Sequence, residues 1–163
     1  MSEKEEYKRL IDEGIYKIQE GKYIEAIEFI NKSIELKKDW EISYFYRAVA
    51  YHALSNFNEA MLDYTKAIQL NPKMIDAYYN KSKIILENPN SNKQEIEKAI
   101  EDLKIAISYD EKFIDALFAL AAAYKKVAKY HEALIYLEKV LEIEPSAIHA
   151  KALKKLILEK YIV

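Results

Sequence analysis

Turn-forming residues and cysteine are scarce in this sequence. Its 163 residues include no cysteine, two glycines and three prolines. Without cysteine the chain has no disulfides, no thiolate ligands for a metal and no cysteine nucleophile. An all-β fold needs a turn between successive strands, and so few glycines and prolines argue against it. The composition favours helices joined by short connections.

The sequence also lacks an excess of either charge and any long apolar run. Basic and acidic residues number 25 and 27, a net charge of −2. A nucleic-acid partner would call for a basic excess to neutralise phosphates. No uncharged apolar stretch approaches the ~20 residues of a membrane span, and the start, MSEKEEYKRL, has no apolar signal-peptide core. We therefore expect a cytoplasmic protein with neither nucleic acid nor membrane as partner.

Recognisable catalytic motifs are missing as well. The three histidines, His52, His131 and His149, have no second histidine or carboxylate at metal-ligand spacing on their own helices. The sequence contains no glycine-rich phosphate loop, no G-x-S-x-G and no HExxH. We expect no catalytic residues, no metal and no cofactor, so the protein is predicted not to be an enzyme.

A repeated pattern organises what is present. Four alanines share the settings E-A-I, E-A-M, K-A-I and E-A-L; they are Ala26, Ala60, Ala99 and Ala133. The first two are 34 residues apart, as are the last two, and the middle two are 39 apart. Bulky residues follow each alanine by four positions: Ile30, Tyr64, Leu103 and Leu137. Compact residues follow by seven: Ser33, Ala67, Ala106 and Val140. These spacings place them on one face of a helix.

A second set of small residues precedes the alanines. It comprises Gly14, Ala48, Ser82 and Ala121, each twelve residues upstream except Ser82, where an insertion intervenes. Small residues on both members of a helix pair allow close antiparallel packing.

This pattern resembles the tetratricopeptide repeat, a 34-residue helix–turn–helix unit. The resemblance implies an all-α fold: a right-handed superhelical solenoid of four repeats plus a C-terminal capping helix, forming a single domain over residues 1–163. The repeats are residues 7–40, 41–74, 75–113 and 114–147, and the capping helix is 148–163. Four such units in tandem are a specific signal.

Two features depart from the family pattern. The leucine usual at position 7 is replaced by Glu13, Arg47 and Lys81, which we interpret as imperfect packing or as long side chains reaching out to water. The third unit also carries a five-residue insertion. Pro89 should end the helix before it, and Asn92 followed by Glu95 predicts a capping box that starts the next helix.

The resemblance places partners in a concave groove lined by the first helix of each repeat. Carried onto this sequence, the predicted groove residues are Ile11, Ile15, Phe45, Tyr46, Val49, Tyr79, Asn80, Lys83, Phe118 and Ala122. Asp12, Asp76 and Asp115 add negative charge. We expect a non-enzymatic adaptor or scaffold that binds an apolar or amphipathic segment of a protein or peptide partner. Packing between adjacent repeats is the alternative role for these side chains.

Some members of the family hold the acidic C-terminal tails of heat-shock chaperones with a two-carboxylate clamp. Of the clamp's Lys, Asn and Arg residues, only Asn80 is present, and only in one register. Where the third unit of the clamp requires Lys and Arg, the chain has Asp76 and Asn80 in one register and Asp115 and Ala119 in the other. We therefore expect no carboxylate clamp.

The terminal segment after Pro145 predicts an amphipathic helix. One broad face should pack on the fourth repeat: Ala150, Ala152, Leu153, Leu156, Ile157 and Tyr161. Leu158 and Ile162 lie instead among lysines and are candidates for self-association. The alternative function is thus a self-assembling structural protein that forms homo-oligomers, and reading of single-stranded RNA is a third hypothesis.

Overall fold

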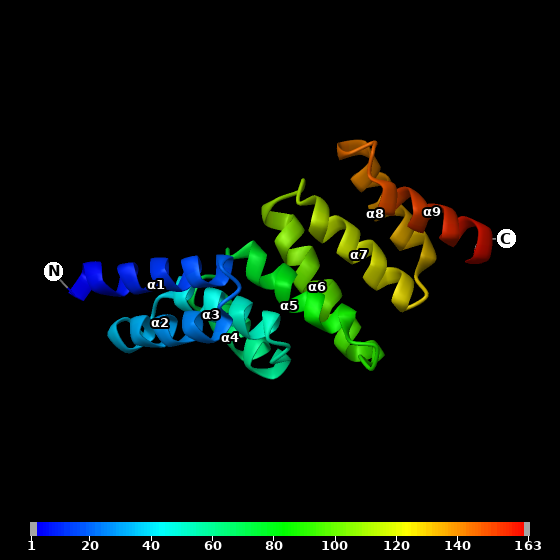
Figure 1. Cartoon of the computed structure of the whole chain (residues 1–163). Coiled ribbons are helices and arrows are strands. Elements are labelled where there is room, and N and C mark those ends of the chain that lie inside the picture. Colours follow the sequence, from blue (N-terminus) through cyan, green and yellow to red (C-terminus); the bar gives the residue numbers. More distant parts are fainter. Residues whose placement is uncertain (1–2, 162–163) are drawn as a thin grey trace. The chain divides into compact units, whose positions relative to one another are not determined.

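The computed structural model describes residues 3–161, and side chains from residue 6 onward. In this part of the chain nine helices follow one another and no strand occurs (Figure 1). The helices are α1 (Glu3–Gln19), α2 (Tyr23–Leu36), α3 (Glu41–Ala53), α4 (Phe57–Leu70), α5 (Ile75–Glu87), α6 (Lys93–Tyr109), α7 (Ile114–Lys126), α8 (Tyr130–Ile143) and α9 (Ile148–Tyr161). The prediction of an all-α helical-repeat fold is confirmed.

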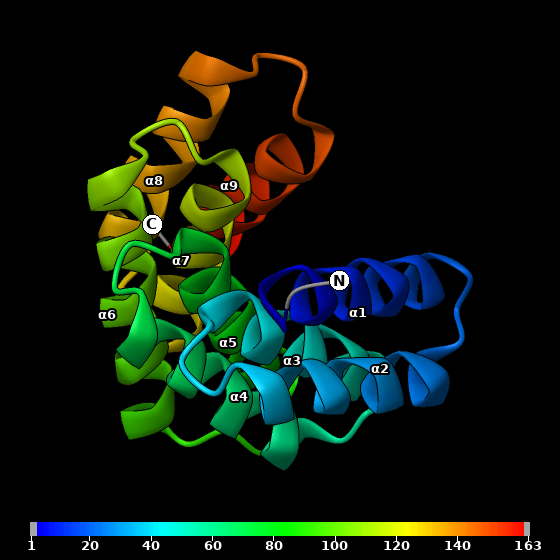
Figure 2. The same cartoon turned by 90° about the vertical axis from the view of Figure 1, so that its left-hand side faces the viewer.

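The chain forms two compact units that divide within α5, after Ala77. In the first unit, α1 packs against α2 and α3 packs against α4, while α2 and α3 join the two pairs. The members of each pair run side by side in opposite directions (Figure 2). In the second unit, α7 contacts α6 and α8, and α9 packs on α8. The prediction that all repeats form one domain stays a prediction.

Small residues lie at the centre of the helix pairs. The four recurrent alanines and three of the four upstream small residues, Ala48, Ser82 and Ala121, are completely buried. Gly14 shows why size matters there, because a Cβ atom at this position would lie 2.6 Å from Cγ1 of Ile30. Ile30 is itself completely buried and has no room to move. The sequence pattern therefore marks the contact line between first and second helices.

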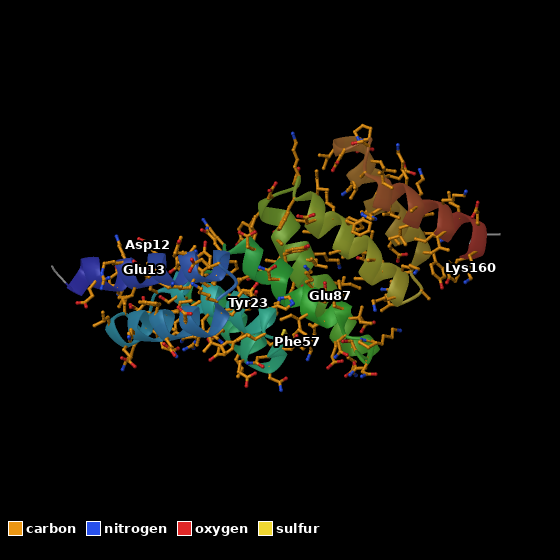
Figure 3. All side chains as sticks on the ribbon, viewed as in Figure 1. Asp12, Glu13, Tyr23, Phe57, Glu87 and Lys160 are labelled. Carbon is orange, nitrogen blue, oxygen red and sulfur yellow. The ribbon has the colours of Figure 1, made fainter. Side chains whose placement is uncertain are left out.

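Three of the turns between paired helices share one backbone conformation. Gly21, Ser55 and Ala128 occupy equivalent positions and have φ of 74°, 60° and 60°. At Ser55 the turn is closed by two hydrogen bonds, from the Ser55 amide to the His52 carbonyl and from the Asn56 amide to the Tyr51 carbonyl, both 2.9 Å. This is the Schellman arrangement, which favours glycine at the left-handed residue. The helices α2 and α4 then begin at Tyr23 and Phe57 (Figure 3).

The insertion in the third repeat has the predicted helix boundaries. Helix α5 ends at Glu87, two residues before Pro89, and α6 begins after Asn92. The Asn92 side chain accepts a hydrogen bond from the Glu95 amide at 3.0 Å, and the Glu95 carboxylate accepts one from the Asn92 amide at 2.8 Å. The capping box is confirmed.

Two of the charged residues at position 7, Arg47 and Lys81, form ion pairs within their repeats. Arg47 donates from Nε and Nη2 to the two carboxylate oxygens of Asp63, at 2.6 and 2.8 Å, and from Nη1 to Asn31 at 2.7 Å. The Asp63 carboxylate raises the pKa of Arg47 above its usual value. In the next repeat Lys81 pairs with Asp102 at 2.8 Å. The interpretation of loose packing or extended side chains was wrong at these two positions, because each cation bridges the two helices of its repeat.

Helix α9 covers the fourth repeat with a narrower face than predicted. Ala150 and Ile157 are buried and Leu153 is half-buried, but Ala152 and Leu156 are exposed. The ring of Tyr161 stacks on Tyr130 of α8, with centroids 4.5 Å apart. In the described part of the chain, no helix is both long enough and apolar enough to span a membrane.

The left-handed turns generate a first prediction. Replacing Ser55 or Ala128 with glycine should raise the free energy of unfolding by about 1 kcal/mol each, because an L side chain is strained at positive φ. Gly21→Ala is the matched control, since a Cβ there meets no atom within 4 Å and should cost a similar amount through the backbone alone. Chemical denaturation measures all three, and a loss of stability in the glycine variants would contradict the assignment.

A second prediction concerns the Arg47–Asp63 pair. Asp63→Ala should lower the free energy of unfolding by about 2 kcal/mol, because it leaves a largely buried guanidinium without its bidentate partner. The double variant Arg47→Leu, Asp63→Tyr gives the residues that the fourth repeat has at the same positions, Leu120 and Tyr136.

That double variant should lie within about 1 kcal/mol of the parent protein, since well-packed apolar residues commonly replace a buried ion pair without loss. Urea denaturation measures the free energy of unfolding of both variants. The slope of this free energy against urea concentration should be the same as in the parent protein. A double variant as unstable as Asp63→Ala would mean that the ion pair itself is indispensable to this repeat.

Candidate partner-binding surface

The predicted groove residues lie on the first helix of each repeat and are mostly half-buried. Half-buried side chains are Ile15, Phe45, Tyr46, Val49, Tyr79, Asn80, Lys83, Phe118 and Ala122. Ile11 is the exception, because it is only 2% exposed and belongs to the core between α1 and its neighbours. Leu158 is 44% exposed, and Ile162 lies outside the described residues.

In the first unit, an aromatic pair on α3 dominates this surface. The ring of Phe45 meets that of Tyr46 edge-on, with centroids 5.3 Å apart, and lies 5.9 Å from the buried ring of Tyr64. Phe45 is therefore held in place from below while its outer edge stays accessible. Asp12 projects from α1 into solvent on the same unit (Figure 3).

In the second unit, Tyr79 and Phe118 have the corresponding role. Both pack against the buried cluster between α6, α7, α8 and α9. The ring of Tyr79 lies 5.2 Å from that of Phe113. Burial raises the pKa of the Tyr79 hydroxyl, and the nearby carboxylates of Asp115 and Glu87 raise it further. The hydroxyl therefore stays protonated at neutral pH and can donate a hydrogen bond beside an acidic side chain.

Next to Phe118 the surface is hollowed. A hollow of about 330 Å³ lies between the start of α7, the end of α8 and the start of α9. Its apolar lining includes Ile114, Phe118 and Ile148, of which Ile148 is 76% exposed. Asp115 and Glu144 bring carboxylates to it, and His149 brings an imidazole. We name this hollow the α7–α9 hollow.

Several residues of the α7–α9 hollow were not predicted from the sequence as part of a binding surface. Glu144 was assigned only to the fourth repeat, and Ile148 and His149 only to the capping helix. The signal was present, because Ile148 and His149 lie 34 residues after Ile114 and Asp115. Helix α9 thus continues the repeat register as a fifth first helix, and its second position faces the same surface as Asp115.

The chemistry of this hollow suits binding rather than catalysis. Apolar side chains can take up an apolar group, and two carboxylates can pair with a cation at its edge. In residues 3–161 no group of three or more His, Cys, Asp and Glu side chains is placed to hold a metal ion. A side chain with an apolar stem and a positive end would complement these groups.

A larger hollow of about 720 Å³ lies elsewhere in the second unit, lined by α5, α6 and α7 and the turn after α7. Its lining is mostly charged, and the charges neutralise one another through the pairs Lys81–Asp102 and Lys104–Glu101, both within 3 Å. Because these charged groups are already paired, the α7–α9 hollow is the better candidate for recognition of a charged ligand despite its smaller volume.

Comparison with protein families identifies the repeats independently. Residues 14–39 and 42–74 each match a tetratricopeptide repeat model, and residues 114–162 match the Fis1 C-terminal tetratricopeptide repeat. The tetratricopeptide repeat and J domain-containing co-chaperone DNJ1 of Cryptococcus neoformans is 26% identical over 145 residues, which cover 84% of this chain and 27% of that protein.

Two further similarities concern a shorter segment and the fold. The mitochondrial import receptor subunit TOM70 of Homo sapiens is 38% identical over 68 residues, 39% of this chain and 11% of TOM70. The structure of MamA (41-end) from Desulfovibrio magneticus RS-1 superposes with a TM-score of 0.84 at 18% identity, covering 96% of this chain and 86% of that one. The matched segments thus span well under two thirds of both curated relatives.

These matches agree with the geometry. The recurring unit begins at an equivalent point in four helices: α3, α5, α7 and α9. Small residues at equivalent positions are buried between the paired helices of each repeat. Models of one repeat type match three separate parts of the chain. This protein belongs to the tetratricopeptide repeat family.

Proposed function

We propose that this protein is a non-enzymatic adaptor that holds a segment of a protein partner against the first helices of its repeats. The observation that supports this most directly is the α7–α9 hollow, where Phe118 and Ile148 lie beside the carboxylates of Asp115 and Glu144. Half-buried aromatic rings that are fixed from below are typical anchors for partner side chains.

The relatives support a role in protein handling. One is described as a co-chaperone and the other as an import receptor subunit. Because this chain spans only 27% and 11% of those proteins, their partners are not transferred to it. What carries over to the proposal is the general role of a protein-binding module.

The charge of the surface suggests the type of ligand. Asp115 and Glu144 line the α7–α9 hollow, and Asp76 and Asp12 are exposed on first helices of the first unit. An apolar segment that carries a lysine or arginine would complement this chemistry, whereas an acidic tail would be repelled. This preference is opposite to that of a carboxylate clamp.

The alternative function, self-assembly, is favoured by one observation. Leu156 and Leu158 of α9 are 40% and 44% exposed. Around Leu158, however, lie Lys151, Lys154 and Lys155, and two copies of such a face would repel each other. We therefore propose the adaptor ahead of the homo-oligomer.

Our third prediction tests the ligand class with a phage-displayed library of random peptides. Selection on the immobilised protein should enrich apolar peptides that contain lysine or arginine. Asp115→Lys should weaken the binding of the enriched peptides about tenfold, because it replaces attraction by repulsion at the edge of the hollow. Glu28→Lys makes the same charge change on an exposed part of α2 and should leave binding unchanged.

Two results would contradict this proposal. Enriched peptides that bind equally well to Asp115→Lys would place the site elsewhere. Enrichment of acidic peptides, followed by calorimetric binding of an acidic chaperone-tail peptide, would establish a carboxylate-binding site that the sequence does not predict.

The fourth prediction separates the adaptor from the self-assembling protein. Light scattering on a sizing column should give a mass near the 19.1 kDa of one chain at every concentration tested. Leu158→Glu serves as the comparison, because it should change nothing if the protein is monomeric. A dimer that dissociates in this variant would make self-association the primary function.

A further inference from the structure

Helix α9 exposes residues at repeat positions that α7 buries against α8. In α7 the residues at repeat positions 4, 8 and 11 are Leu117, Ala121 and Tyr124, and all three are buried. They face α8, as the stacking of Tyr124 on Tyr136 shows, with centroids 5.7 Å apart. The residues 34 positions later are Lys151, Lys155 and Leu158. All three are exposed in the described part of the chain.

This face of α9 is hollowed as well as charged. A depression of about 380 Å³ lies between α8 and α9, with Leu141 and Leu158 as its apolar residues. Lys151, Lys154 and Lys155 surround it, with Glu159 as the acidic residue of the lining. Lys154 is held to Glu138 of α8 at 2.8 Å, whereas Lys155 reaches Glu159 only at 3.8 Å. Lys155 is therefore available for another carboxylate.

We propose that this face binds an acidic amphipathic helix of a partner protein, in the place that the second helix of a fifth repeat would take. Such a helix would present carboxylates to Lys151 and Lys155 and an apolar side chain to Leu141 and Leu158. The site shares no lining residue with the α7–α9 hollow and does not depend on the proposed function of that hollow.

The repeats themselves indicate which positions of the bound helix face the lysines. Position 8 of the first repeat is Gly14, whose Cβ would lie 2.6 Å from Ile30 and 3.4 Å from the carbonyl of Ala26. The equivalents of Ala26 and Ile30 in α8 are Ala133 and Leu137, four residues apart on one helix face. In a helix docked on α9, these two positions would lie over Lys155.

A second copy of the protein cannot fill the site by pairing α9 with α9, because the lysines would then face each other. A flat anionic membrane would satisfy the lysines but not the depression with its two leucines. A helix with both acidic and apolar residues matches both features, and this is why we favour it over lipid.

The fifth prediction uses a probe taken from the chain. It is a fluorescein-labelled peptide of residues 130–143 carrying Ala133→Glu and Leu137→Glu. Fluorescence anisotropy should show saturable binding that weakens as salt is added, since the charges lie at the surface. Lys151→Glu with Lys155→Glu should weaken binding about tenfold. Lys66→Glu with Lys98→Glu, two exposed lysines on other helices, should have no effect.

A charge swap makes the test specific. The same peptide with lysine at positions 133 and 137 should bind the Lys151→Glu, Lys155→Glu protein and not the parent. Because both lysines are exposed, circular dichroism should show unchanged helicity in the variant. Lys151→Gln with Lys155→Gln should give an intermediate affinity.

Three results would overturn the proposal. The acidic peptide could fail to bind, it could bind the charge-reversed protein as well as the parent, or the swapped pair could fail to restore binding. Lysine-dependent binding to mixed phosphatidylcholine and phosphatidylserine vesicles, without binding of the peptide, would assign the face to anionic lipid instead.

Discussion

The close approach of paired helices at small residues is the constraint on which the rest of this structure depends. At Gly14 even one methyl group would collide with Ile30, which is fully buried. Ala48, Ser82 and Ala121 take the same place in the other repeats and are completely buried too. Because interior packing is dense, this spacing fixes how far apart the helices lie and which of their faces remain outside. The outward faces of the first helices are then available for binding without any cost to the core.

Most of the fold could be predicted from the periodic pattern of small and apolar residues in the sequence. The features that could not be predicted are contacts between particular pairs of residues. The recurrent alanines, the capping box at Asn92 and Glu95 and the ends of the helices could be predicted because each depends on residues close in sequence. The pairing of Arg47 with Asp63 could not, since nothing local shows that two residues 16 positions apart meet across a repeat. The burial of Ile11 was missed for the same reason: the repeat register assigned it to a surface that packing encloses.

The candidate site was predicted in type but not in full. Phe118 and Asp115 were expected on the groove surface, and both line the α7–α9 hollow. Glu144, Ile148 and His149 complete it because α9 returns to the position of a first helix. Recognising that required the 34-residue register to be carried past the fourth repeat. Two carboxylates and an imidazole then meet at the ends of three helices, an arrangement that no single helix of the sequence reveals.

Helix α9 is thus the point at which two surfaces of opposite character meet. Its first turn contributes Ile148 to a hollow with Asp115 and Glu144, and the turns that follow contribute Lys151 and Lys155 to a basic depression. The stacking of Tyr161 on Tyr130 and the Lys154–Glu138 ion pair hold α9 against α8. A ligand that suits one surface is repelled by the other, so each surface excludes the other's partner.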